Sequence, residues 1–290
     1  MSTASPKDYY VPHGTHWPII GSIGLTLTFI GFARFLHGAE MTTMFLGIAI
    51  VIFMMFGWFG QVIDESLAGT YNQQVDMSFR WGMGWFIFSE VMFFGAFFGA
   101  LFYARIFSIP WLGGASNNDA TAWLLWPDFE AVWPLLAVPL ADKFEVAREA
   151  MGAWGLPAIN TAILLTSGLT VTLAHHALKR RDRIWLVYWL FATVALGFFF
   201  VGLQAVEYVH AYEELNLRLD SGIYGSTFFM LTGFHGFHVT MGATMLLVIM
   251  IRAMKGHFSP ENHFAFEAVA WYWHFVDVVW LGLFIFVYWI

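Results

Sequence analysis

The sequence predicts an all-α integral membrane protein built as a bundle of seven transmembrane helices. The 290-residue chain is 59% hydrophobic and only 11% charged, whereas soluble domains carry about 25% charged residues. It contains seven apolar runs long enough to cross a bilayer, which takes about 20 helical residues. These runs are continuously apolar rather than alternating, which favours helices over a β-barrel.

Most of the predicted helices are joined by short connections, so consecutive helices are expected to be antiparallel neighbours. The connection over 108–156 is long and rich in Trp and Pro, which indicates a segment along the outer membrane surface. The residue pattern over 141–153 predicts a short amphipathic helix. The loop either has a function or only covers its neighbours. We expect one membrane domain over 1–290, with helices near 17–36, 41–60, 81–107, 157–178, 184–208, 223–251 and 264–290.

Lysine and arginine are unequally divided between the two sides of this bundle. One side carries Lys7, Arg80, Lys179, Arg180, Arg181, Arg183, Arg252 and Lys255, and the other carries Arg34, Arg105, Lys143, Arg148 and Arg218. Because cytoplasmic loops hold the excess of positive residues, the N-terminus is expected in the cytoplasm and the C-terminus outside. The polar first residues lack the apolar segment of a removable signal peptide.

Histidine and carboxylate are the metal ligands that this chain offers. It has no cysteine, which excludes disulfides, iron–sulfur clusters and thiolate-bound metals. His235 and His238, in GFHGFH, lie three positions apart on one helix face, and His274 lies on another helix. These histidines form no obligatory ligand set. The spacing is compatible both with a haem or metal site and with buried imidazoles that form hydrogen bonds.

The third predicted helix contains one buried carboxylate, Glu90, flanked by phenylalanines. It is either a proton-relay or ion site, or a neutral acid hydrogen-bonded to another helix. Only Ser89 beside it offers a further donor, which favours the packing interpretation. Gly95 and Gly99 on the same helix form a small-xxx-small pair that lets another helix approach closely.

The last predicted helix carries Glu267, Trp271, His274 and Asp277 at helical spacing, which predicts one polar stripe facing protein. His274 and Asp277 are interpreted either as a pair that orients an imidazole toward a metal, or as a hydrogen-bonded pair that fixes helix contacts.

Several long motifs resemble one known family. FSEVMFF (88–94), AHHALKRRDR (174–183), LQAVEY (203–208), GIYGSTFFMLTGFHGFHV (222–239) and HFAFEAVAWYWHFVDVVW (263–280) closely resemble the subunit III family of cytochrome c oxidase, the haem–copper terminal oxidase. The opening YYVPHGTHWPIIGS resembles bacterial members. The resemblance covers nearly the whole chain.

The resemblance implies a seven-helix bundle whose first two helices are splayed from the other five around a phospholipid-holding cleft. It implies an accessory, non-catalytic subunit of a proton-pumping respiratory oxidase in the bacterial inner membrane. Such a subunit stabilises subunit I and supports proton uptake and O2 access. Family members carry no cofactor and no metal, since haem and copper belong to subunits I and II, so GFHGFH is expected to pack. The expected partners are subunits I and II and membrane phospholipids.

The resemblance also implies roles for single residues. Glu90 matches the family's buried carboxylate, and His235, His238, His274 and Asp277 become structural polar groups. The positions whose side chains face lipid headgroups are Trp58, Glu65, Arg252, Lys255 and His257. Arg80 is added because a cation at a cytoplasmic helix end suits anionic phosphates. Tyr71 and Asn72 stand where many members have histidines, which puts that headgroup contact in doubt.

Three other classes of membrane protein are alternatives to this family. A seven-helix retinal protein needs a lysine within the membrane, and every lysine here falls in a loop or at a helix end. A transporter would show broken helices in two corresponding halves, and no such symmetry is visible. A free-standing haem cytochrome is the remaining alternative.

Overall fold

A computed structural model describes residues 9–11, 14–138 and 143–290, so Lys7 lies outside the described residues. Packing divides the chain into two compact units, one up to Trp81 and one from Gly82 onward. The boundary falls inside one continuous helix. The two units are described separately, and the single membrane domain expected over 1–290 stays a prediction, as does the splayed cleft.

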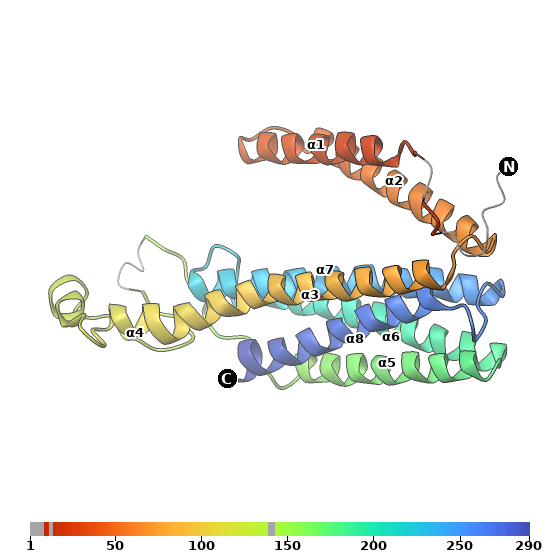
Figure 1. Cartoon of the computed structure of the whole chain (residues 1–290). Helices are drawn as coiled ribbons and strands as arrows, with labels where there is room; N and C mark the ends of the chain where they lie inside the picture. The colour runs from red at the N-terminus through yellow and green to blue at the C-terminus, as the bar shows by residue number, and fades with distance from the viewer. Residues whose placement is uncertain (1–8, 12–13, 139–142) are drawn as a thin grey trace. The chain divides into compact units, whose positions relative to one another are not determined.

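The first unit is a helical hairpin followed by the start of a third helix. Helix α1 (Trp17–Leu36) packs along α2 (Thr42–Leu67), as Figure 1 shows, and α3 (Gln73–Tyr103) begins after a short turn. Small residues bring α1 and α2 together, because a Cβ at Gly31 would collide with the backbone of Met44 and one at Gly47 with that of Thr28. This close approach of two backbones is the membrane packing mode that glycine permits.

The core of the second unit is formed by four long helices, α5 (Leu156–Lys179), α6 (Arg183–Glu213), α7 (Ile223–Met254) and α8 (Phe264–Leu283), the last continued by the π-helical turn η3 (Phe284–Trp289). In Figure 1, α5 to α8 run side by side, and α5 packs against both α6 and α8, while α7 packs against α6 and α8. These four helices therefore close into a bundle.

Trp273 of α8 lies at the centre of this bundle and is fully buried. Its ring fills the space left by Gly197 on α6 and Gly242 on α7, since a Cβ on either glycine would lie 2.8 Å from a ring carbon. Its indole Nε1 donates a hydrogen bond of 2.9 Å to Ser167 Oγ on α5. One side chain therefore contacts all three other helices.

The part of α3 within the second unit packs on α7 and α8 through aromatic rings. Phe93 and Phe97 contact Phe234 of α7, and Phe94 contacts Phe275 of α8. The glycine pair takes no part in this interface, because a Cβ at Gly95 or Gly99 would meet no atom of the described residues within 4 Å. Bulky phenylalanines, not glycines, form this helix interface within the chain.

The third membrane-crossing helix is longer than its sequence pattern suggests. It continues from α3 through the π-helical turn η1 (Ala104–Ser108) and α4 (Ile109–Leu112), so it runs from Gln73 to Leu112 rather than over 81–107. The polar first turns are helical because Asn72 Oδ1 accepts the Val75 N–H and Arg80 pairs with Asp76 one turn away. A cap and an ion pair thus stabilise residues that hydropathy alone leaves out.

The long loop does not contain the amphipathic helix expected over 141–153. Residues 139–142 lie outside the described residues, and 143–153 form turns and extended chain. Their backbone bonds go elsewhere, since Arg148 N donates to Leu215 O and Met151 N to the Tyr224 hydroxyl. The loop has instead a π-helical turn, η2 (Thr121–Leu125).

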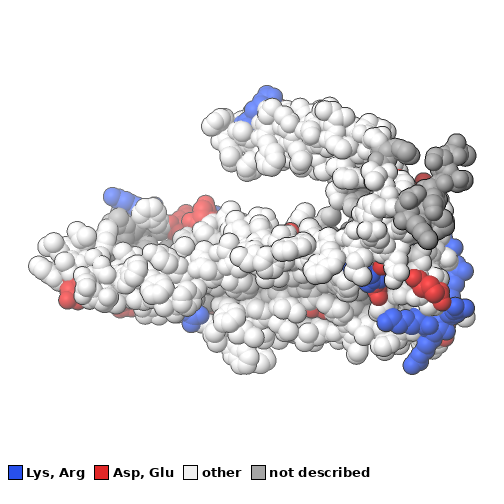
Figure 2. All heavy atoms as spheres, in the orientation of Figure 1, with Lys and Arg blue, Asp and Glu red and all other residues white. Residues whose placement is uncertain are grey.

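Within the described residues, seven helices are long and apolar enough to cross a membrane. This confirms the predicted all-α, seven-span integral membrane fold. Figure 2 shows lysines and arginines gathered at one end of the second unit, and the α5–α6 turn there carries the run Lys179–Arg183. Much of the helical surface in the same view has few charges, as a surface facing lipid requires.

Candidate functional site

The most specific buried polar contact in the second unit joins Glu90 of α3 to His238 of α7. Glu90 Oε2 lies 2.9 Å from His238 Nε2, and the two side chains are 20% and 9% exposed. His238 Nδ1 lies 2.6 Å from the Phe234 carbonyl oxygen. Because a carbonyl oxygen only accepts, Nδ1 carries a hydrogen. The contact between Nε2 and Oε2 then needs a second proton, shared as an imidazolium–carboxylate pair or as a neutral acid and a neutral imidazole.

Aromatic rings surround this proton-holding pair. Phe94 and Tyr272 lie 5.0 Å and 6.3 Å, centroid to centroid, from the His238 ring, and Phe93 lies 6.0 Å from it. Ser89, the one neighbouring donor that the sequence suggested, bonds to the Phe86 carbonyl of its own helix. Such surroundings favour the packing interpretation of Glu90.

His235 belongs to a different contact, although it shares a helix with His238. It is fully buried, and its Nε2 lies 3.2 Å from the Val276 carbonyl oxygen of α8, so Nε2 donates. Its ring packs against Phe200 and Trp280. Its Nδ1 has no hydrogen-bond partner among the described residues. The two histidines of GFHGFH therefore reach different neighbouring helices.

His274 and Asp277 also contact each other, with His274 Nδ1 3.6 Å from Asp277 Oδ2. His274 Nε2 lies 3.3 Å from Thr172 Oγ1 of α5. The predicted polar stripe faces protein only in part, because Asp277 is buried whereas Trp271 and His274 are exposed. The two residues connect α8 to α5.

The predicted lipid-facing residues of the first unit include a hydrogen-bonded network around Glu65. Gln61 Nε2 donates to Glu65 Oε1 at 3.0 Å, and the Tyr71 hydroxyl donates to Oε2 at 2.8 Å. Trp17 Nε1 donates to Gln61 in turn. Burial, followed by the hydrogen bond to Glu65, raises the pKa of Tyr71. Trp58 is exposed on the same helix as Glu65.

The second group of predicted lipid-facing residues lies at the end of α7. Arg252 is buried, and its guanidinium carbon lies 4.7 Å from the centroid of the Phe258 ring. His257 N donates to the Arg252 carbonyl oxygen. Burial, followed by the charges of Arg252 and Lys255, lowers the pKa of His257. Lys255 is exposed, so the structure brings these three residues together with one cation at the surface and one within the protein.

The structure shows two further polar features that the sequence did not predict. His175 of α5 lies beside His263 and Glu267 at the start of α8. The spacing of His263 and Glu267, one helical turn apart, was the available signal. Their meeting with His175 depends on the antiparallel pairing of α5 and α8, which no local pattern reveals.

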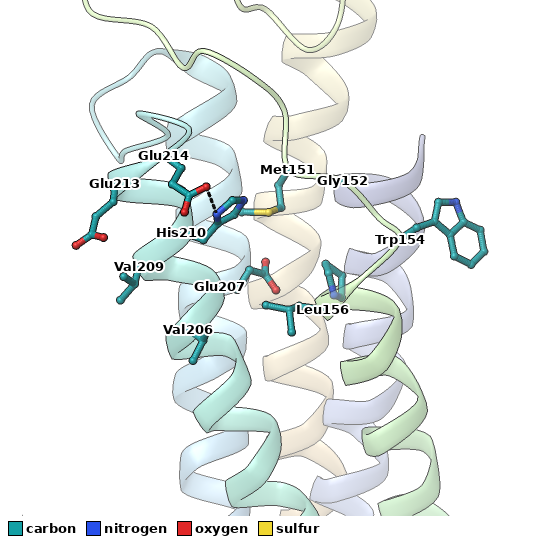
Figure 3. Close-up of a pocket in the computed structure, with 11 residues that line it drawn as sticks. Met151, Gly152, Trp154, Leu156, Val206, Glu207, Val209, His210, Glu213 and Glu214 are labelled. Carbon is teal, nitrogen blue, oxygen red and sulfur yellow. Dashed lines mark ion pairs between the residues drawn. The ribbon is translucent and has the colours of Figure 1, made fainter.

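The other feature is a pocket of about 470 Å³ where the long loop meets the end of α6. Figure 3 shows Glu207 extending into it beneath Met151, with His210 and Glu214 paired at its rim. Glu207 itself is held by the Tyr288 hydroxyl, which donates to Oε1 at 2.6 Å. The pocket is lined mainly by apolar groups over one anchored carboxylate.

The chain matches one protein family over nearly its whole length. The model of the family "Cytochrome c oxidase subunit III" matches 7–118 and 128–290. Cytochrome c oxidase subunit 3 of Drosophila melanogaster is 40% identical over 290 residues, which cover 100% of this chain and 99% of that protein. The same subunit of Marchantia polymorpha is 39% identical over 292 residues, covering 100% and 98%. That of Carassius auratus is 39% identical over 282 residues, covering 97% and 96%.

Proposed function

The chain belongs to the cytochrome c oxidase subunit III family, and from this premise we propose that it is an accessory, non-catalytic subunit that stabilises the catalytic subunit of the oxidase. Cytochrome c oxidase is a respiratory oxidoreductase complex, and this chain is one of its integral membrane subunits. The proposed neighbours are subunits I and II, which carry the haem and copper. The proposed location is the bacterial inner membrane, with the N-terminus cytoplasmic and the C-terminus periplasmic.

The observation that carries the proposal is the Glu90–His238 contact. It joins α3 to α7 through a shared proton inside a shell of phenylalanines. A carboxylate held in this way supports a rigid, packed helix pair next to the catalytic subunit. Support of proton uptake and of O2 access is proposed as a consequence of that contact, since a rigid neighbour keeps the entry paths of the catalytic subunit in place.

The surface of α3 supports the proposed contact with another subunit. Gly95, Ala96, Gly99 and Ala100 are exposed, and a Cβ on either glycine would meet no atom of the described residues within 4 Å. A stripe of small residues lets a second helix approach closely. We assign this face to a helix of a partner subunit of the oxidase.

Phospholipid binding is proposed for two groups of residues. Lys255 is exposed at the end of α7, where a cation suits an anionic headgroup. Trp58 is exposed on α2, and its indole suits the membrane interface. Glu65, Arg80, Arg252 and His257 are proposed to orient such headgroups, although Glu65, Arg80 and Arg252 already have protein partners.

The experiment replaces Glu90 by Ala in the complete oxidase, with Glu213→Ala, an exposed acid, as the matched control. Haem and copper contents are expected to stay at the wild-type level, because the redox centres lie in other subunits. The Glu90→Ala oxidase is expected to lose activity during turnover at least several times faster, because His238 loses its partner. Unchanged inactivation kinetics, or haem retained by this chain after its separation from the complex, would contradict the proposal.

A further inference from the structure

The three side chains His175, His263 and Glu267 lie together and have no part in the proposed function. His175 comes from the last turn but one of α5, His263 is the N-cap of α8, and Glu267 lies in the first turn of α8. Their exposed fractions are 25%, 9% and 15%. The cluster is therefore enclosed by protein yet open enough for a small ion to enter.

The spacing of the three ligand atoms matches the coordination sphere of a tetrahedral metal. His175 Nε2 and His263 Nε2 are 3.1 Å apart, and Glu267 Oε1 lies 3.6 Å from the first and 3.4 Å from the second. Zinc binds nitrogen and oxygen at about 2.0–2.1 Å, which places neighbouring ligands of a tetrahedron about 3.3–3.4 Å apart. The three atoms thus already form a triangle of the required size.

The imidazole of His263 is fixed in the orientation that a metal ligand needs. Its Nδ1 lies 3.1 Å from the Ser259 carbonyl oxygen, so Nδ1 carries the hydrogen and the neutral ring has its lone pair on Nε2. This atom faces His175 and Glu267. A backbone carbonyl that holds the other ring nitrogen is the usual support of a metal-binding histidine.

Neighbouring residues position the His175 ring and the turn before α8. The ring of buried Phe266 packs 5.3 Å from that of His175, and Ser259 and Asn262 exchange backbone hydrogen bonds in the turn before α8. The Arg181–Glu261 ion pair, 2.8 Å long, joins that turn to the α5–α6 turn. Lys179, one turn after His175, opposes a cation electrostatically, whereas the carboxylate of Glu267 offsets one positive charge.

We propose that His175, His263 and Glu267 form a binding site for one divalent transition-metal ion of the Zn²⁺ class, which joins α5 to α8. Two imidazoles and one carboxylate are a donor set that zinc uses, with the fourth position left to water. The ion is not part of the oxidase redox chemistry. It replaces the hydrogen bond of 3.1 Å between the two imidazoles with two bonds to one cation.

The test titrates Zn²⁺ into the full chain in detergent after treatment with a chelator, in competition with a chromophoric chelator. One equivalent is expected to bind and to raise the Tm of the chain. His263→Ala and Glu267→Gln are expected to weaken that binding by more than about tenfold. Glu267→Gln keeps the side-chain shape, so it remains informative if His263→Ala fails to fold. His176→Ala is the matched control, because this exposed histidine is adjacent to His175 and outside the cluster.

Co²⁺ is the second probe, because a four-coordinate nitrogen–oxygen site gives it a much stronger visible absorption than that of the octahedral solvated ion. The proposal predicts this absorption in the wild type and in His176→Ala, and its loss in Glu267→Gln. It is overturned if the wild type binds no stoichiometric metal, or if the cluster variants bind as the wild type does. Either result would mean that the two histidines share a hydrogen bond instead.

Discussion

Three imidazoles in the second unit, two buried and one exposed, each contact a different helix. His238 reaches Glu90 on α3, His235 reaches the Val276 carbonyl on α8, and His274 reaches Thr172 on α5. The three histidines, for which the spacing left a metal site and buried hydrogen bonds open, thus make three separate helix contacts. At this scale the neighbour of each side chain, not its position in a motif, determines what it does.

The hydrogen bond from Tyr71 to Glu65 gives a pH-dependent prediction. The pKa of Tyr71 lies above the ordinary 10.0 in the folded chain, so folding favours the neutral phenol. The stabilisation, about 0.5–1.5 kcal/mol, is fully present below pH 10.0. It shrinks as pH rises above 10.0, because the unfolded tyrosine then ionises first.

The measurement compares the thermal unfolding of the wild type and Tyr71→Phe at neutral pH and above pH 10.0. Tyr71→Phe is expected to be less stable at neutral pH, with a smaller difference at high pH. Tyr9→Phe, which changes an exposed tyrosine, is the control. A Tyr71→Phe difference that stays constant or grows above pH 10.0 would rule out the proposed linkage.

At the scale of helices, packing of the second unit depends on one large ring that fits against two glycines. Trp273 occupies space that only glycine leaves on α6 and α7, and it bonds to α5. The sequence predicts the existence of all four helices well, because each is a long apolar run. It does not predict this match, because hydropathy counts glycine and tryptophan without regard to which residues face each other.

Gly242→Ala is expected to destabilise the chain by about 1–3 kcal/mol, because the added methyl group would overlap the Trp273 ring. Gly236→Ala on the same helix is the matched control, since a Cβ there meets no atom within 4 Å. That control is expected to be neutral or to stabilise by up to about 1 kcal/mol. Equal effects of the two substitutions on the midpoint of detergent unfolding would show that the Trp273 contact is not limiting.

At the scale of the whole molecule, the family and the seven-span fold follow from the sequence, but the grouping of polar residues does not. Glu90 is recognisable as a buried acid, yet its partner lies 148 positions away. His175, His263 and Glu267 meet only because α5 and α8 pack together. A local sequence pattern does not reveal which distant helices pack together.

The exposed glycines of α3 give the prediction at this scale. Gly99→Leu is expected to leave the stability of the separate chain within about 0.5 kcal/mol of the wild type, because a Cβ at this position meets no atom of the described residues within 4 Å. It is expected to lower the amount of chain that stays in the purified oxidase, because it blocks the close approach of a partner helix. Gly202→Leu on α6, where a Cβ also meets nothing, is the control. Equal retention of the two variants would place the subunit contact elsewhere.

The indole of Trp273 also has a consequence for biosynthesis. Translation adds α8 after α5, α6 and α7, so these three helices enter the membrane before the ring that connects them exists. Until then Gly197 and Gly242 lack the ring that fills the space beside them. A chain without α8 is therefore expected to have an incompletely packed bundle, and completion of this last helix is the step that fills its core.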